Sequence, residues 1–275
     1  MCARCGKIRR GAEALAGSER SGSMETISSR KNEKIVRLKR LGASRGDRRA
    51  FGEFLCDGEK LLREALLHGA EIRMILTDEE EGASLPDGAP AYLVSRDMLE
   101  YVSPLKNPQH VVFSCAMPDR SGLTGPPGGP YIILENIQDP GNVGTIMRTA
   151  NAFSMPGMLL VGACADPYNP KAVRASMGAV FRQSAAEVSY DGLAKLRGEG
   201  LKIYGAFLGD SCRYVRSVDL RSAAVAIGSE GEGLSAKMLS LCDDTIIIPM
   251  ASECESLNAG VAAAVVMWEM RRGEL

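Results

Sequence analysis

The stretch "ILENIQDPGNVGTIMRTANAF", residues 133–153, changes from a strand pattern to a helix pattern within a few residues. Its first apolar residues are typical of a buried strand, and the Asp-Pro-Gly at 139–141 predicts a sharp turn. An apolar stripe then recurs at helical spacing: Val143, Ile146, Met147 and Ala150. Asn142, Thr145 and Arg148 are predicted to share the other face, so polar groups that can bind a ligand follow closely on a buried strand.

The rest of this region repeats the alternation of strand and helix. Strands are predicted at 131–135, 157–162, 202–208, 223–228 and 244–249, and helices at 141–153, 169–182, 191–198, 234–241 and 256–272. The strand segments "GMLLVG", "AAVAIG" and "TIIIPM" are apolar almost throughout, which is typical of a parallel sheet with helices on both faces. Because ligands of such sheets bind beyond the carboxyl ends of the strands, we expect the functional residues in the loops that follow them.

Proline and glycine separate this α/β region from the rest of the chain. The segment "PDRSGLTGPPGGP", residues 118–130, holds four Gly and four Pro and predicts a linker. Residues 24–117 are predicted to form a small α/β domain, and residues 131–275 a second, larger one. In the small domain, strands are predicted at 54–56, 72–76 and 111–116, and a helix at 57–68. Residues 1–23, rich in Gly, Ser, Ala and Arg, are predicted to be a disordered extension.

Charge is distributed unevenly along a chain whose net charge is −1. The first 50 residues hold 14 Lys and Arg against 5 Asp and Glu, and the remainder holds 19 against 29. A basic amino-terminal part favours an anionic partner, RNA or DNA first, with a solvated leader as the alternative.

Cysteine usage argues against a metal site. The eight cysteines are scattered and the chain has two histidines, so no second ligand pair completes a zinc site with Cys2 and Cys5. We expect reduced, mostly buried cysteines, no metal and a cytoplasmic protein. The sequence has neither an 18-residue apolar run nor the pattern of a secretory signal.

Two further strands end in polar loops. "AIGSEGEGLS", residues 226–235, has the spacing G-x-x-G-x-G, which differs from the dinucleotide fingerprint, and it lacks the Lys-Ser/Thr of a phosphate loop. Its glycines permit close approach of a flat ligand. In "IIIPMASECESLNAGVAAAVVMWEM", residues 246–270, a helix is predicted to open near Ser256, with Asn258 in its first turn. An ordinary glycine turn and an ordinary capped helix are the alternatives.

Together the three segments resemble the three sequence motifs of the SpoU (TrmH-like) branch of the SPOUT RNA methyltransferases. The resemblance rests on "ENIQDPGNVGTIMRTANAF", "IGSEGEGLS" and "IPMASECESLNAGVAAA", and it covers about residues 131–272. The earlier segment "FLCDGEKLLREALLHGAEIRMIL" is similar to the small substrate-binding domain that precedes many of these enzymes. The resemblance implies transfer of a methyl group from S-adenosylmethionine to a ribose 2′-hydroxyl of RNA, a carboxyl-terminal trefoil knot, and a homodimer with its active site at the interface.

The resemblance also implies five catalytic residues: Arg148, Asn142, Glu230, Ser256 and Asn258. Arg148 matches the motif arginine that binds the RNA phosphate and helps to activate the hydroxyl. The sequence leaves open whether it acts as a base or as an electrostatic anchor, and the high pKa of a guanidinium favours the anchor. Asn142 would orient Arg148 or the ribose, and the other three would organise the site. A solvated arginine on a helix surface is the alternative for Arg148.

Main-chain groups and apolar side chains in the three loops are implied to hold the cofactor. The candidates are Ala206, Phe207, Leu208, Gly228, Glu230, Gly233, Ile248, Pro249, Met250, Ser256, Leu257 and Asn258. RNA contacts are predicted for Arg148, Lys171, Arg174, Arg45, Arg48 and Arg49, and for the neighbouring Arg37, Lys39 and Arg40. Phosphate contacts would supply affinity and salt dependence without sequence choice, and for each residue a solvated position is the alternative.

These observations favour an RNA ribose methyltransferase acting on ribosomal RNA, because a separate amino-terminal domain is common among the ribosomal members of the family. A transfer RNA ribose methyltransferase and a non-catalytic RNA-binding protein that retains the fold remain open. A nicotinamide-dependent oxidoreductase is disfavoured by the glycine spacing and by the lack of a ribose-binding acid at the usual distance.

Overall fold

The structure is a computed structural model that describes residues 24–79, 85–86, 88–118, 130–209, 211–251, 253 and 256–273. The predicted extension 1–23, Cys2 and Cys5, and most of the predicted linker lie outside the described residues. Contacts divide the chain into a first unit, Met1–Pro118 with Tyr168–Pro170, and a second unit, Asp119–Pro167 with Lys171–Leu275. Each unit is described by itself.

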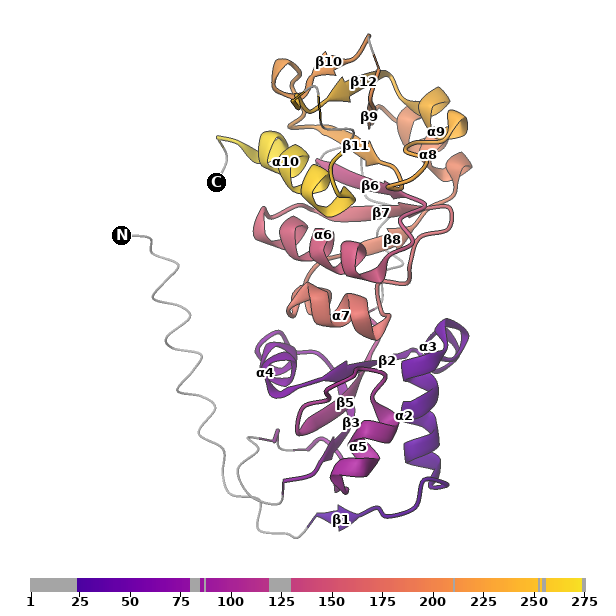
Figure 1. The fold of residues 1–275 in the computed structure, drawn as a ribbon, viewed down its shortest axis with the longest axis vertical. Coiled ribbons are helices and arrows are strands. Elements are labelled where there is room, and N and C mark those ends of the chain that lie inside the picture. Colours follow the sequence, from indigo (N-terminus) through magenta and orange to yellow (C-terminus); the bar gives the residue numbers. More distant parts are fainter. Residues whose placement is uncertain are drawn as a thin grey trace, which may run out of the picture. The chain divides into compact units, whose positions relative to one another are not determined.

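The second unit is built on a seven-stranded sheet in which every neighbouring pair is parallel (Figure 1). The order across the sheet is β10-β12-β9-β11-β6-β7-β8. The strands are β6 (Tyr131–Glu135), β7 (Gly157–Val161), β8 (Ala185–Glu187), β9 (Lys202–Ala206), β10 (Arg213–Tyr214), β11 (Ala223–Ile227) and β12 (Asp244–Ile247). The predicted parallel α/β sheet is confirmed. The two edge strands, β8 and β10, were not predicted because they are too short to show a period.

Helices cover both faces of this sheet, as predicted. On one face α6 (Pro140–Ala152) packs against α10 (Ala259–Arg271), and on the other α8 (Tyr190–Gly198) packs against α9 (Ala236–Leu241) (Figure 1). Helix α7 (Pro170–Ser176) is shorter than the predicted 169–182 because Met177 and Gly178 have positive φ angles of 51° and 89°. The 3-10 turns Ala179–Phe181 and Val215–Ser217 complete the unit.

The core follows the strand pattern, with one exception. Every residue of β6, β7 and β11 is buried, as expected for strands covered on both faces. The apolar stripe predicted for α6 is buried throughout. The prediction that "TIIIPM" is equally buried is wrong, because only Ile246 of β12 is fully buried. One neighbour of β12 is the two-residue edge strand β10, which leaves β12 poorly covered.

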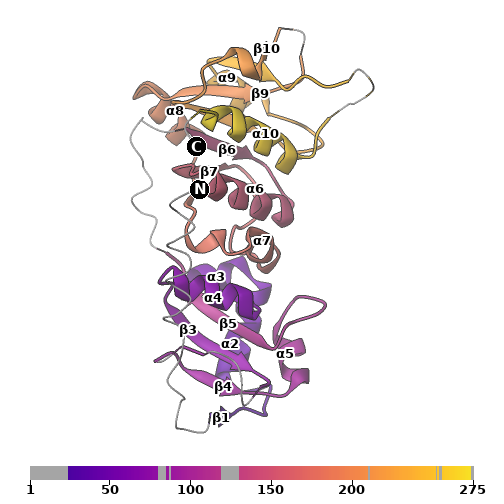
Figure 2. The same cartoon turned by 90° about the vertical axis from the view of Figure 1, so that its left-hand side faces the viewer.

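The first unit contains a mixed five-stranded sheet in the order β1-β4-β3-β5-β2 (Figure 2). Its strands are β1 (Glu25–Thr26), β2 (Glu53–Asp57), β3 (Ile72–Thr77), β4 (Ala91–Leu93) and β5 (Val111–Ala116). Its helices are α2 (Glu33–Ala43), α3 (Arg45–Phe51), α4 (Glu59–Leu67) and α5 (Arg96–Val102). Ile35, Leu38 and Leu41 of α2 are buried in the core, so the charged residues of α2 lie on its outer side. Within the described residues, no helix combines the length and apolarity that crossing a membrane requires.

Candidate active site

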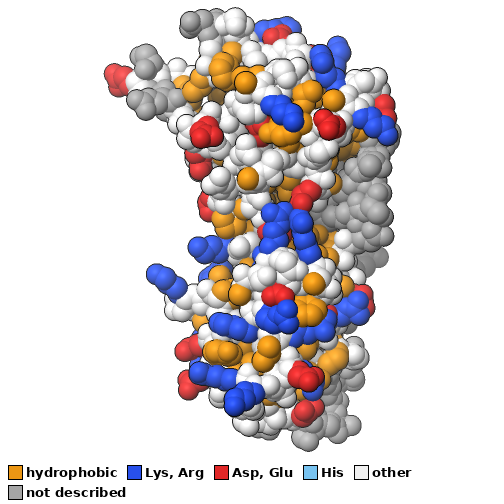
Figure 3. Space-filling model, turned by 90° about the vertical axis from the view of Figure 1, so that its right-hand side faces the viewer, with side chains coloured by type: hydrophobic (Ala, Val, Ile, Leu, Met, Phe, Trp, Pro, Cys, Tyr) orange, Lys and Arg blue, Asp and Glu red, His pale blue; other side chains and the backbone are white. Residues whose placement is uncertain are grey.

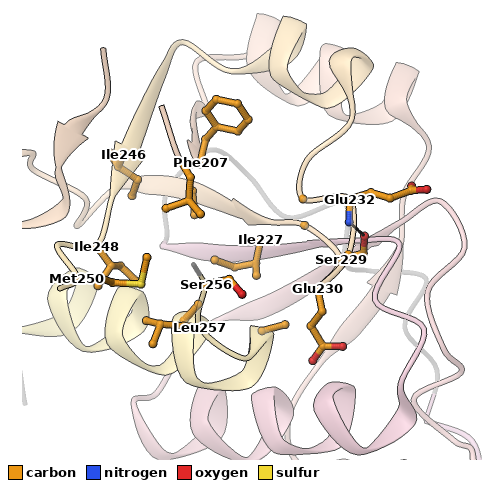
Figure 4. Close-up of a pocket in the computed structure, with 17 residues that line it drawn as sticks. Phe207, Ile227, Ser229, Glu230, Glu232, Ile246, Ile248, Met250, Ser256 and Leu257 are labelled. Atoms are coloured by element: carbon orange, nitrogen blue, oxygen red, sulfur yellow. Dashed lines mark hydrogen bonds between the residues drawn. The ribbon is translucent and has the colours of Figure 1, made fainter. Parts of the chain in front are cut away.

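A pocket of about 430 Å³ opens where β9, β11 and β12 end (Figure 4). The loops after these strands and the start of α10 form its walls, as expected for a parallel sheet. Its lining consists of Ala206, Phe207, Leu208, Ile227, Gly228, Ser229, Glu230, Gly231, Glu232, Gly233, Ile246, Ile248, Met250, Ser256, Leu257, Ala259 and Ala262.

Of the predicted cofactor-binding residues, all but Pro249 and Asn258 line this pocket. Ser229 and Glu232, which were not predicted, lie between predicted residues of the same loop, so continuity along the loop could have found them. Ile246 and Ala262 also line the pocket. They belong to a strand and a helix whose sequences have the apolar pattern of core segments. No local pattern distinguishes a residue that lines a pocket from a core residue.

The pocket has an apolar side and a polar side. Ile246, Ile248 and Leu257 approach one part of it, and Ser229 and Glu230 lie at another (Figure 4). Such a surface suits a ligand that has a flat apolar part and a positively charged part. Glu230 on this polar side can supply the negative charge, whereas the side chain of Glu232 points away from the pocket (Figure 4).

The loop after β11 is closed by its own backbone. Ser229 and Gly233 exchange two hydrogen bonds, with N···O distances of 3.2 and 2.9 Å. A Cβ at Gly228 would lie 2.1 Å from the carbonyl carbon of Gly233, and Gly233 has φ of 66°. Glycine is therefore required at both positions by the turn itself, in addition to any ligand contact that the sequence predicts.

Three of the predicted catalytic residues form one hydrogen-bonded network. Asn142 Nδ2 donates to Glu230 Oε1, and Asn258 Nδ2 donates to the same oxygen at 2.9 Å. Asn258 Nδ2 also lies 3.2 Å from Asn142 Oδ1. The network thus joins the start of α6, the loop after β11 and the start of α10.

Both asparagines are held at helix starts. Asp139 caps α6 by accepting from the backbone N–H groups of Gly141 and Asn142, at 3.2 and 3.3 Å. Asn258 caps α10 by accepting from Gly260 N–H at 2.9 Å and Val261 N–H at 3.3 Å. The prediction that the last helix opens near Ser256 is therefore wrong. The helix begins at Ala259, and Asn258 supplies the cap that the sequence assigned to serine.

Arg148 lies outside the network. It is exposed on α6, does not line the pocket, and within the described part of the chain has neither a hydrogen-bond nor an ion-pair partner. The prediction that Asn142, Thr145 and Arg148 share one face is wrong. Asn142 is buried, with 9% of its surface exposed, whereas Thr145 and Arg148 are exposed to solvent. Residues six apart on an α-helix point about 120° away from each other.

One predicted RNA contact is contradicted by the structure. Arg48 is 2% exposed and its Nη1 donates to Leu41 O at 2.7 Å, so its guanidinium ties α3 to α2 inside the first unit. Arg49, Lys171 and Arg174 are exposed, and Arg45 is half-buried. The sequence misled at Arg48 because a run of arginines on a short helix does not show which member faces the core.

A group of potential metal ligands occurs in the first unit. Asp78, Glu79 and His110 offer ligand atoms within 4.8 Å of one another. Asp78 is already engaged by His110 at 2.9 Å and by Arg96 at 3.5 Å, which is an ordinary arrangement of ion pairs. A metal-free reaction stays a prediction.

The fold and the pocket define an α/β protein that binds a small ligand beyond the carboxyl ends of parallel strands. The model of the SpoU rRNA methylase family matches residues 129–268, and the model of the MRM3-like substrate binding domain matches residues 32–112. The chain belongs to the SpoU rRNA methylase family.

Curated relatives and solved structures agree with this assignment. The chain is 31% identical over 251 residues to the 23S rRNA (guanosine(2553)-2′-O)-methyltransferase of Bacillus subtilis, covering 90% of this chain and 100% of the relative. It is 30% identical over 278 residues to the 23S rRNA (uridine(2479)-2′-O)-methyltransferase of Streptomyces viridochromogenes, covering 94% and 96%. The structure of an AdoMet-bound rRNA methyltransferase from Sinorhizobium meliloti superposes with a TM-score of 0.81 at 26% identity, covering 92% of this chain and 100% of that one.

Proposed function

We propose that this protein is an S-adenosylmethionine-dependent methyltransferase that modifies a ribose 2′-hydroxyl in ribosomal RNA. The observation that carries the proposal is the Asn142–Glu230–Asn258 network beside the pocket, built from the three segments that resemble the family's motifs. The activity of the two curated relatives supports the reaction. These two relatives modify different nucleosides of 23S rRNA, so they do not indicate which nucleotide this protein modifies.

The pocket fits S-adenosylmethionine. The apolar side chains Ile246, Ile248 and Leu257 can enclose an adenine ring, and the carboxylate of Glu230 favours a positive charge nearby. When bound, this cofactor supplies a methyl group that is already activated by a sulfonium charge. The residues of the chain therefore have to bind the two reactants, align them and exclude competing geometries.

Arg148 is proposed to bind the RNA phosphate and to favour the developing alkoxide. A guanidinium remains charged at neutral pH and matches the geometry of a phosphate. Because Arg148 lies outside the pocket of its own chain, we propose that it serves the pocket of a second copy. Ser256 lines the pocket and is proposed to contact the cofactor.

A homodimer is proposed through the outer side of α6 and α10. Val261 and Trp268 of α10 are 50% and 49% exposed, and their spacing of seven residues places them on one side of the helix. Large exposed apolar side chains grouped in this way mark interaction surfaces. The trefoil knot and the cytoplasmic location implied by the resemblance stay predictions.

Mixing two inactive variants tests the shared site. In a heterodimer of Arg148→Ala with Glu230→Ala, one intact pocket meets one intact arginine only if Arg148 acts across the interface. We expect each variant alone to be inactive and the mixture, refolded together, to recover methyl transfer. A mixture as inactive as its components would show that Arg148 acts within its own chain. Sedimentation of the wild type as a monomer would contradict the proposed dimer.

The reaction itself is tested by binding and by mapping. Calorimetry is expected to show binding of S-adenosylmethionine and none of NAD. Mapping of 2′-O-methyl groups in RNA from cells with and without the protein is expected to show the loss of a mark in ribosomal RNA. Binding of NAD alone, or loss of a mark in transfer RNA alone, would contradict the corresponding part of the proposal.

For the first unit we propose that RNA phosphates bind along the outer side of α2. Lys31, Lys34, Arg37, Arg40 and Arg73 line a groove there, together with Phe51. Lys and Arg side chains are interleaved with hydrophobic ones over this unit in Figure 3. The guanidiniums of Arg37 and Arg40 lie 4.7 and 5.0 Å from the centre of the Phe51 ring, which holds both in place. Their ion pairs with Glu53 and Asp47 reduce the net charge, so we expect moderate, salt-sensitive affinity.

A further inference from the structure

Glu135, the last residue of β6, is a completely buried carboxylate that no step above uses. Burying a carboxylate is unfavourable unless hydrogen-bond donors replace water. Here Oε1 accepts from the Tyr190 hydroxyl and from the Ser235 hydroxyl, both at 2.6 Å. Oε2 accepts from the Ser235 backbone N–H at 2.8 Å. Both oxygens of Glu135 are therefore engaged by residues far away in the sequence.

Ser235 is the point where the loop after β11 enters α9. Its hydroxyl donates to Glu135 and at the same time accepts from Met238 N–H at 3.1 Å, which caps α9. A hydroxyl can donate and accept simultaneously, whereas an alanine at this position can do neither.

Both ends of this loop are thereby attached to the end of β6. At one end, Ile227 pairs with Leu134 in the sheet, and at the other Ser235 is bound by the adjacent Glu135. Residues 228–233 between these two attachments all line the pocket, and Glu230 belongs to the asparagine network. The hydrogen bonds between Ser229 and Gly233 close the turn but do not connect it to the sheet.

Tyr190 completes the arrangement from the start of α8. Burial, together with the hydrogen bond to Glu135, raises the pKa of Tyr190, so its hydroxyl keeps the proton that it donates. Lys237 Nζ of α9 lies 4.4 Å from the centre of the Tyr190 ring. The carboxylate thus binds both helices on this face of the sheet.

We propose that Glu135 is a positioning residue for the cofactor pocket, acting through Ser235 to hold the loop 228–234 at the end of β6. Where it concerns S-adenosylmethionine, this inference rests on the proposed function. Glu135 does not line the pocket, so it acts on the cofactor only through the position of this loop.

The variant Glu135→Gln keeps the volume of the side chain but presents an N–H₂ group to donors. We expect it to weaken binding of S-adenosylmethionine about tenfold, the equivalent of one or two hydrogen bonds. The matched control is Leu193→Ala, which removes a fully buried side chain of α8 and should lower the melting temperature without changing this affinity. Unchanged cofactor affinity in folded Glu135→Gln would overturn the proposal.

A second pair of variants protects the test against misfolding of Glu135→Gln. Ser235→Ala removes the hydroxyl and should weaken cofactor binding, whereas Ser235→Thr retains the hydroxyl and should bind nearly as wild type does. Equal weakening in both variants would show that the hydroxyl is not the link.

Hydrogen exchange of the cofactor-free protein provides a readout that does not depend on activity. We expect the amides of Ser235 and Met238 to exchange faster in Ser235→Ala than in wild type or in Leu193→Ala. Unchanged exchange would overturn the positioning role. Failure of the wild type to bind S-adenosylmethionine would instead contradict the proposed function, which keeps the two failures distinct.

Discussion

The network at the pocket and the basic side of α2 use polar residues in opposite ways. Asn142, Glu230 and Asn258 come from three distant segments and bond to one another. The cations of α2 come from adjacent turns of one helix and pair with nearby carboxylates such as Glu53 and Asp47. The first arrangement fixes the geometry of a few groups, and the second spreads charge over a surface.

This contrast predicts at which positions a single substitution has a large effect. In the network each group has its own partners, so the loss of one leaves the others unpaired. On the basic side of α2 each cation contributes a similar share, because phosphate contacts are nearly interchangeable.

Arg148→Ala is expected to have the largest effect, because the guanidinium of Arg148 is proposed both to bind the RNA phosphate and to stabilise the developing charge. We expect turnover to fall at least about 100-fold, by analogy with the loss of an oxyanion donor, while cofactor affinity is unchanged. Single-turnover methyl transfer and calorimetry measure the two quantities. Arg221→Ala, an exposed arginine that precedes β11 and pairs with Asp219, is the control and should remain close to wild type. Near-normal turnover in Arg148→Ala would show that Arg148 is not part of the active site.

Two variants of Asn258 distinguish its role in the hydrogen-bonded network from its role as the cap of α10. Asn258→Ala loses both, so we expect about 10- to 100-fold slower methyl transfer and a loss of about 1 kcal/mol in the free energy of unfolding. Asn258→Asp keeps an oxygen to cap α10 but cannot donate to Glu230. It should lose activity to the same extent and retain more of the stability. Full activity in Asn258→Asp would show that only the cap matters.

Single cations of α2 should matter less. Lys34→Ala or Arg37→Ala is expected to weaken RNA binding a few-fold and to reduce the slope of log affinity against log salt by about 1. Filter binding over a range of salt concentrations measures both. Arg63→Ala on α4 is a charge-matched control in the same unit. An effect of Arg63→Ala as large as that of Arg37→Ala would mean that the outer side of α2 has no special role.

Arg48 and Arg49 are neighbours on one short helix, but Arg48 is buried and Arg49 is exposed. Arg48→Ala removes a buried guanidinium bonded to Leu41 O, and we expect a loss of about 1–3 kcal/mol in the free energy of unfolding. RNA affinity of the folded variant should be unchanged. Arg49→Ala should leave stability nearly unaltered because its side chain is exposed. Urea unfolding measures both variants, and an equal stability of the two would contradict the structural role of the Arg48 side chain.

The parallel sheet and most residues of the pocket can be predicted from the order of the amino acids. Strands such as "GMLLVG" are apolar on both faces, and a chain of this length can bury them only beneath helices on either side. The polar segments after β6, β11 and β12 had to meet, because parallel strands end at one edge of a sheet. The hydrophobic period and the direction of each strand depend on short segments of the chain. They can therefore be inferred from the order of the residues.

The choice of partners among the polar residues depends on the packing of the complete fold. It turned Asn142 inward to Glu230 and left Arg148 exposed on the same helix, a difference set by the neighbours of α6. It also buried Arg48 and chose Asn258 as the cap of α10. It brought Glu135 against Ser235, 100 residues later in the chain. Hydrogen bonds between distant segments leave no period in the sequence, because they depend on packing that the whole fold creates.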